Sequence, residues 1–138
     1  MVRNKTFIIG CGRLGASVDL DAYAKGDNVT VIDAKEESFD LLSESYAGYT
    51  QVLDATDIKT LERLGMDSVR DLIVTTGNDN VNLFLAHVAD KVFHIPHIYV
   101  RFDDPSLKDL IQGYNIQGIY PFQLSFETFT ALKKEDDR

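Results

Sequence analysis

The chain has 138 residues, of which 44% are hydrophobic and 26% charged, a balance typical of a globular domain. That length suits one domain with a hydrophobic core and is too short for two, and the composition excludes a disordered or fibrous protein. Acidic residues outnumber basic ones by 22 to 14, and the formal net charge is -8. This surplus argues against a nucleic-acid partner, because broad nucleic-acid-binding faces are basic.

Cysteine content and hydropathy indicate the compartment. The single cysteine, Cys11, cannot form an internal disulfide or a cysteine-based metal cluster, so a reducing cytoplasm is expected. The apolar runs are far shorter than the roughly 20 residues that cross a bilayer, and the basic N-terminus has no signal-peptide core. The three histidines lack metal-ligand spacing, and no catalytic triad or carboxylate pair stands out. We expect no direct membrane insertion, no metal site and no catalytic residues.

Short β-branched runs alternate with helical patterns along the chain. Strands are expected at 6–9, 29–32, 49–53, 71–75, 97–100 and 118–120. The first five end about 21 to 25 residues apart, which fits a strand, a helix and two tight loops. The pattern predicts a Rossmann-like α/β fold, a doubly wound parallel sheet of about six strands with helices on both faces. This nucleotide-binding domain is expected over 1–134, with a last helix from about 122 to 134 and a charged tail at 135–138.

A glycine motif directly follows the first expected strand. This G-x-G-x-x-G consists of Gly10, Cys11, Gly12, Arg13, Leu14 and Gly15. The first glycine permits a tight turn, the second lets a pyrophosphate approach the backbone, and the third lets the helix pack on the strand. The N–H groups and the dipole at the start of the following helix stabilise a bound anion. Because this effect is local, an acidic protein can still bind a polyanion. Arg13 either contacts a phosphate or is a solvated surface residue, and Cys11 is expected to fill space rather than act as a nucleophile.

Asp33 stands directly after the second expected strand. Its separation from the glycine motif is close to the roughly 20 residues found in dinucleotide-binding folds. A carboxylate there accepts hydrogen bonds from adenosine ribose hydroxyls and repels a 2′-phosphate, which favours NAD(H), ATP, ADP or AMP over NADP(H). The following Ala34 and Lys35 belong to the same predicted site. The alternative is a structural glycine turn with a helix-capping aspartate.

Ligands in such sheets bind at the carboxyl ends of the strands. After the third strand, Asp54 either accepts from an adenine amino group or forms a turn, and Thr56 or Asp57 caps the next helix. After the fourth, Gly77 either lets the backbone approach a nucleotide or belongs to an ordinary turn. After the fifth, Arg101 is placed for a phosphate or for a salt bridge with a following aspartate. The predicted site residues at these strand ends are Asp54, Ala55, Thr56, Thr76, Gly77, Asn78 and Arg101.

The glycine motif and four further segments together resemble a known family. The four segments are 29–33, 54–57, 76–83 and 100–101. They resemble the N-terminal RCK domain, also called the TrkA-N or KTN domain, over about residues 5 to 132. The resemblance implies a cytosolic regulatory subunit of a Trk- or Ktr-type potassium uptake system, or of a channel, that binds NAD(H) or ATP/ADP.

The resemblance also implies partners and roles for the site residues. Family members pair and form rings on a membrane-embedded potassium transporter or channel subunit, which implies a homodimer or higher ring oligomer at the inner face of the cell membrane. Phosphates would lie over the three glycines beside Arg13, ribose on Asp33 and adenine near Asp54. One departure is the first helix, where Asp19 and Asp21 stand in place of mixed apolar and basic residues, so a different outer face is expected.

Three functions remain open on the sequence. A nucleotide-responsive regulator is favoured, because a complete cofactor cleft leaves no residues for a substrate domain. The alternatives are the cofactor-binding domain of an NAD-dependent oxidoreductase and an assembly scaffold with a vestigial cleft. The last helix carries an apolar stripe that either packs on its own core or forms a dimer contact: Phe122, Phe126, Phe129 and Leu132.

Overall fold

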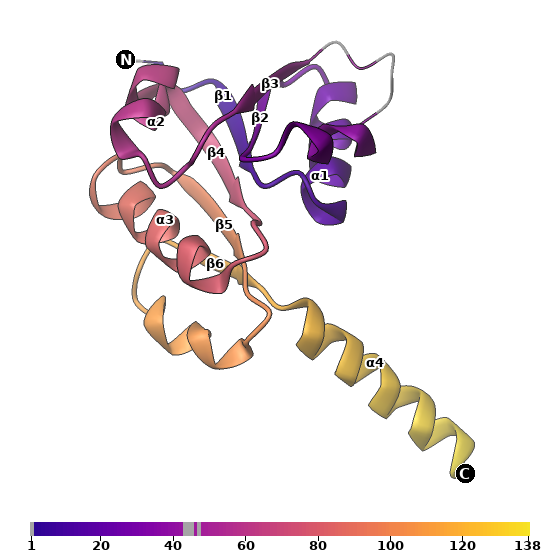
Figure 1. Cartoon of the computed structure of the whole chain (residues 1–138). Helices are drawn as coiled ribbons and strands as arrows, with labels where there is room; N and C mark the ends of the chain where they lie inside the picture. Colours follow the sequence, from indigo (N-terminus) through magenta and orange to yellow (C-terminus); the bar gives the residue numbers. More distant parts are fainter. Residues whose placement is uncertain (1, 43–45, 47) are drawn as a thin grey trace.

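Six strands alternate with helical segments in the computed structural model, which describes residues 2–42, 46 and 48–138 (Figure 1). Residues 1, 43–45 and 47 of the predicted domain lie outside the described residues. The strands are β1 (Lys5–Ile9), β2 (Asn28–Asp33), β3 (Tyr49–Val52), β4 (Val69–Val74), β5 (His97–Arg101) and β6 (Gln117–Ile119). Each lies within two residues of its expected position.

The strands form one parallel sheet in the order β3-β2-β1-β4-β5-β6. The chain moves outward from β1 to β3, returns to β4 beside β1, and then moves outward in the other direction. Ile9 at the end of β1 is therefore in register with Ile32 on one side and Val74 on the other. The predicted Rossmann-like fold is confirmed, and the order reverses between β1 and β4, where such folds bind ligands.

The α-helices are α1 (Arg13–Ala24), α2 (Ile58–Leu64), α3 (Asp79–Lys91) and α4 (Pro121–Asp136). The expectation of a helix between each pair of the first five strands is wrong after β2, where the chain forms a short 3-10 helix, η1 (Glu36–Leu41). Two further 3-10 helices, η2 (Met66–Ser68) and η3 (Pro105–Leu110), precede β4 and follow β5. After β5, η3 begins at Pro105 and ends at Leu110, and Gly113 adopts a φ of +84° three residues later. In the described part of the chain, none of the helices combines the length and apolarity that a membrane span requires.

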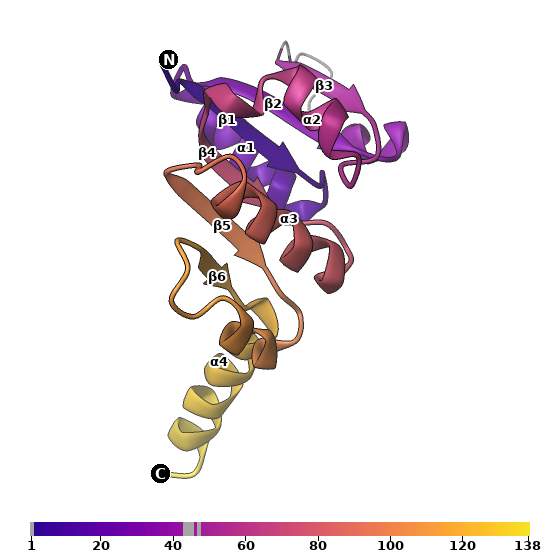
Figure 2. The same cartoon turned by 90° about the vertical axis from the view of Figure 1, so that its left-hand side faces the viewer.

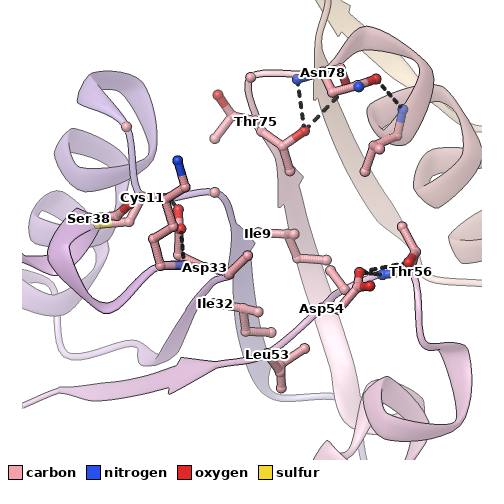
Figure 3. A pocket seen from close by; sticks show the side chains of 18 of the residues that line it. Ile9, Cys11, Ile32, Asp33, Ser38, Leu53, Asp54, Thr56, Thr75 and Asn78 are labelled. Carbon is pink, nitrogen blue, oxygen red and sulfur yellow. Dashed lines mark hydrogen bonds between the residues drawn. The ribbon is translucent and has the colours of Figure 1, made fainter.

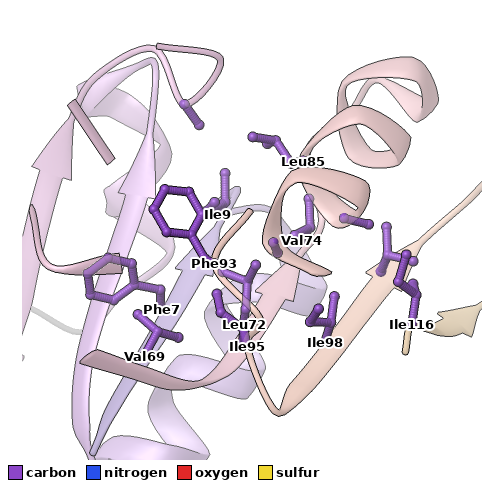
Figure 4. Packing of buried hydrophobic residues seen from close by; sticks show 14 of the residues in the cluster. Phe7, Ile9, Val69, Leu72, Val74, Leu85, Phe93, Ile95, Ile98 and Ile116 are labelled. Carbon is purple, nitrogen blue, oxygen red and sulfur yellow. The ribbon is translucent and has the colours of Figure 1, made fainter. Parts of the chain in front are cut away.

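The two faces of the sheet have separate cores because successive strand residues point in opposite directions. Phe7 and Ile9 face the larger core under α2 and α3, which also contains Leu85 (Figure 4). Ile8, between them, faces the smaller core under α1 and η1 together with Ala16. Figure 2 shows α3 in front of the β4 and β5 region and α1 behind β1. Helices on both faces bury the central strands, which explains their nearly continuous apolar sequence.

The last helix, α4, extends away from the sheet in both views (Figures 1 and 2). Pro121 stands at its first turn, where its missing N–H costs no hydrogen bond, and the helix continues two residues into the predicted tail. The apolar stripe is exposed, with Phe126 and Phe129 each 60% accessible. The interpretation that this stripe packs on the domain's own core is therefore wrong.

Asp19 on α1 is buried, although an outer helix face was expected for it. It is fully buried in the smaller core, where its Oδ1 accepts a 2.8 Å hydrogen bond from the Tyr46 hydroxyl. Its Oδ2 has no hydrogen-bond partner among the described residues. Burial raises the pKa of Asp19, and the Tyr46 hydrogen bond opposes that rise. Asp21, by contrast, is exposed and pairs with Lys25 at 2.8 Å.

We expect the Asp19→Asn variant to gain stability relative to the wild type as pH rises. Because the folded-state pKa of Asp19 lies above its ordinary value, the wild type loses proton-linked stability as pH increases through that raised pKa. Asparagine keeps an acceptor for Tyr46 and does not titrate. Urea unfolding followed by circular dichroism between pH 4 and pH 8 measures the difference in free energy of unfolding. A difference that stays constant across this range contradicts the prediction.

Candidate functional site

A cleft of about 570 Å³ opens at the carboxyl ends of β1 to β5 (Figure 3). This volume lies within the range of small-molecule sites. Its lining residues are Ile9, Gly10, Cys11, Gly12, Ile32, Asp33, Ala34, Lys35, Ser38, Leu53, Asp54, Ala55, Thr56, Thr75, Thr76, Gly77, Asn78, Val81 and Arg101. The cleft therefore spans the point between β1 and β4 where the strand order reverses.

The structure brings the predicted site residues together around this cleft, except Arg13, Leu14 and Gly15. Arg13 begins α1 with an exposed side chain and is not among the residues that line the cleft. Gly15 is buried beneath the loop. A Cβ atom there would lie 1.9 Å from the Gly10 carbonyl oxygen, so Gly15 serves helix packing and not the cleft surface.

The glycine loop leaves an open approach at the start of α1. Gly10 has a φ of +105°, and a Cβ atom there would lie 2.4 Å from the Thr75 carbonyl oxygen at the end of β4. A Cβ atom at Gly12 would meet nothing within 4 Å, so the backbone faces open space at this position. Gly12 is also the N-cap of α1, and no side chain caps the helix. The first N–H groups of α1 therefore suit an anion.

Asp33 anchors the glycine loop from the end of β2. Its Oδ2 accepts a 2.9 Å hydrogen bond from the Cys11 backbone N–H, and its Oδ1 accepts one of 2.9 Å from Lys35 N–H (Figure 3). Carboxylate oxygens have further lone pairs, so hydroxyl groups can still donate to Asp33. Burial, with the charges of Asp19 and Asp33, raises the pKa of Cys11 to about 11, so its thiol stays protonated at neutral pH.

The segment after β3 forms a turn at the edge of the cleft. Asp54 Oδ1 accepts hydrogen bonds from the N–H and the hydroxyl of Thr56, at 2.9 Å and 2.6 Å. These bonds lower the pKa of the Asp54 carboxyl. Asp57, and not Thr56, caps α2 by accepting from Thr60 N–H. The turn interpretation of Asp54 is thus correct, and the same turn also lines the cleft.

Asn82, which sequence reasoning left without a role, joins two edges of the cleft. It is fully buried in the first turn of α3. Its Nδ2 donates to the Thr76 carbonyl at 3.1 Å and to the Arg101 carbonyl at 2.9 Å. Its Oδ1 accepts from the N–H and hydroxyl of Thr76 at 3.0 Å and 2.5 Å. The side chain therefore fixes the turn after β4 against the end of β5.

Arg101 contributes a cation to the cleft at the end of β5. Its Nη2 lies 3.4 Å from Asp103 Oδ1, so the predicted salt bridge forms. Three buried side-chain atoms in the described residues lack a hydrogen-bond partner, and two of them, Arg101 Nε and Thr75 Oγ1, belong to residues that line the cleft. Buried polar atoms are nearly always paired, so their place here fits a site for a polar, anionic ligand.

Sequence reasoning missed some of the lining residues. They are Ile9, Ile32, Ser38, Leu53, Thr75 and Val81. The signal for three was present, because Ile9, Ile32 and Leu53 end expected strands just before residues already chosen. Together with Val81, these three side chains form the apolar wall typical of ligand clefts. Within the described ranges, no group of three or more histidine, cysteine, aspartate or glutamate residues is arranged to hold a metal ion.

The fold and the cleft together define a Rossmann-like domain of the nucleotide-binding kind. Within that class, the TrkA-N domain family matches residues 6–120, so the chain belongs to the TrkA-N family and the expected resemblance is confirmed.

Known proteins with related sequences are potassium uptake proteins. The chain is 29% identical over 112 residues to the Trk system potassium uptake protein TrkA of Streptomyces coelicolor, covering 81% of this chain and 50% of that protein. It is 31% identical over 101 residues to the Ktr system potassium uptake protein A of Bacillus subtilis, covering 72% of this chain and 45% of that protein. The chain thus spans about half the length of these curated relatives.

A solved structure with the same fold is the NAD(P)-binding domain of an exopolyphosphatase-related protein from Archaeoglobus fulgidus. Its TM-score is 0.76 at 21% identity, over 96% of this chain and 99% of that one.

We expect Asn82→Ala to lower the free energy of unfolding by about 2–3 kcal/mol, because it leaves buried backbone groups of Thr76 and Arg101 unpaired. The matched control is Asn78→Ala, which removes the α3 N-cap bond to Val81 N–H and costs about 1 kcal/mol. Urea unfolding by far-ultraviolet circular dichroism measures both. Equal losses for the two variants would contradict the joining role of Asn82.

Proposed function

We propose that this chain is a regulatory domain that binds an adenine nucleotide, NAD(H) or ATP/ADP, and thereby controls a membrane-embedded potassium transporter or channel. The carrying observation is the exposed backbone at Gly12, which opens onto the cleft at the uncapped start of α1. Membership of the TrkA-N family and the potassium uptake names of the relatives support the regulatory part of the proposal.

The proposed ligand orientation follows the polarity of the cleft. The pyrophosphate or polyphosphate lies over Gly10 and Gly12, where backbone N–H groups and the α1 dipole stabilise negative charge. The adenosine ribose donates to Asp33, whose fixed carboxylate also disfavours a 2′-phosphate. The adenine lies toward Asp54 and Ala55 along the apolar wall that includes Leu53.

The remaining edge of the cleft completes the proposed site. The Thr76 and Gly77 turn and the Arg101 guanidinium approach the ligand from the β4 and β5 side. Asn82 holds these two segments together. No residue is assigned a catalytic role, because binding would act by favouring one arrangement of the assembly over another.

We further propose that the chain works as a homodimer or higher ring oligomer at the inner face of the cell membrane, in the cytoplasm, where the potassium transporter or channel subunit is its partner. The α4 stripe supports this part of the proposal. Phe122, Phe126, Phe129 and Leu132 are 57–63% exposed along one side of a helix that leaves its own domain. Burying each such side chain against a second copy contributes about 1.5–3 kcal/mol.

Asp33→Asn should weaken nucleotide binding about tenfold or more, because a charged acceptor for the ribose hydroxyls is lost. Isothermal titration of the purified domain with NADH, NAD⁺, ATP, ADP and NADPH measures the affinities. The matched control is Asp27→Asn, which makes the same chemical change at an exposed position on the turn before β2.

Micromolar binding, about -8 kcal/mol, that is weakened by Asp33→Asn and unchanged by Asp27→Asn supports the proposed site. A preference for ATP over ADP indicates an energy sensor, and one for NADH over NAD⁺ a redox sensor. Absence of binding by all five nucleotides would reduce the glycine loop to a structural turn and favour the assembly scaffold.

Phe126→Asp should lower the oligomer mass toward the 15.5 kDa of one chain, because a charge in the centre of the stripe opposes its burial. Size-exclusion chromatography with light scattering measures the mass. Ala131→Asp is the matched control, since it introduces the same charge in the same helix on the side away from Phe126. An unchanged mass for a folded Phe126→Asp variant contradicts the α4 contact.

A further inference from the structure

Arg101, the cation proposed to bind the ligand, forms a salt bridge with Asp103 at the edge of the cleft. Arg101 Nη2 lies 3.4 Å from Asp103 Oδ1, longer than the roughly 2.7–2.9 Å of a strong charged hydrogen bond. The Asp103 side chain is 62% exposed, and that of Arg101 is only 23% exposed. The Arg101 side chain is therefore mostly buried in the cleft wall, and the Asp103 carboxylate beside it is mostly exposed.

The backbone on both sides of this pair is anchored. Asp79 Oδ1 and Oδ2 accept hydrogen bonds from the N–H groups of Asp103 and Asp104, each at 2.9 Å. The carbonyl of Arg101 accepts from Asn82, and Asp104 accepts from Ser106 N–H at 3.0 Å. Because the backbone is held at each of these residues, the Asp103 side chain can rotate away from Arg101 without moving the segment.

The Asp103 carboxylate affects a cleft that has few basic residues. Asp33 and Asp54 are acidic, and Lys35 and Arg101 are the basic residues that line the cleft. Asp103 partly offsets the Arg101 charge, and the buried Nε of Arg101 has no partner among the described residues. A phosphate oxygen that approaches Arg101 must therefore displace or share with the Asp103 carboxylate.

We propose that Asp103 is an internal competitor for the phosphate groups of the ligand at Arg101, and that it limits the affinity of the cleft for phosphorylated ligands. This inference rests on the proposed nucleotide site and adds a residue that sets its selectivity. The penalty applies to a ligand that places a phosphate at Arg101 and not to an unphosphorylated nucleoside.

The test measures the binding of ATP, ADP, AMP and adenosine to the wild type and to Asp103→Asn by isothermal titration. The carboxamide has nearly the shape of the carboxylate at an exposed position, and circular dichroism checks that the variant folds. We expect the phosphorylated ligand that binds best to bind about two- to fivefold tighter to Asp103→Asn, the range of an exposed ion pair. Adenosine affinity should stay unchanged, and the gain should shrink at high salt.

Two further variants separate competition from general charge. Asp109→Asn removes the same charge from η3, at an exposed residue outside the cleft, and should leave affinity unchanged. In an Arg101→Gln background, Asp103→Asn should have no effect, because the contested cation is gone.

The outcomes distinguish this inference from the proposed function. Wild-type nucleotide binding that Asp103→Asn leaves unchanged, or that Asp109→Asn strengthens equally, overturns the competition and leaves the nucleotide site intact. Absence of nucleotide binding by both the wild type and Asp103→Asn overturns the proposed site and the competition together.

Discussion

The approach of α1 to the end of β1 is the constraint on which the cleft depends. A Cβ atom at residue 15 would overlap the Gly10 carbonyl, so this separation between helix and strand requires glycine there. The close approach brings the start of α1 to the sheet edge beside Asp33, which holds the loop through Cys11 N–H. The open backbone of the glycine loop and the Asp33 carboxylate thus come from two adjacent strands, β1 and β2.

The strands and the cleft were predictable from the sequence because their signals are local. A buried parallel strand needs a short β-branched run, and the glycine motif needs only its own spacing, so both can be found from neighbouring residues. The helix expected after β2 is wrong because the spacing between two strands does not determine which structure connects them.

Features that depend on residues far apart in the chain were not predictable. Asp19 is buried by a contact with Tyr46, 27 residues away, although two acids on a helix suggest an exposed face. Asn82 acts on Arg101, 19 residues away, and its amide could equally have been a surface residue. Whether Arg13 lines the cleft likewise depends on how α1 packs against the sheet, which its position in the motif does not determine.

The attachment of α4 gives the cleft a short mechanical connection to the exposed helix. Phe102, directly after Arg101, packs its ring 6.3 Å from that of Tyr120, and its N–H donates to the Ile119 carbonyl. Tyr120 immediately precedes Pro121, so the base of α4 contacts the residue next to the cleft's arginine. A 16-residue helix is about 24 Å long, and a rotation of about 10° at its base therefore displaces its far end by about 4 Å. α4 is thus attached beside the end of β5, where Arg101 lines the cleft.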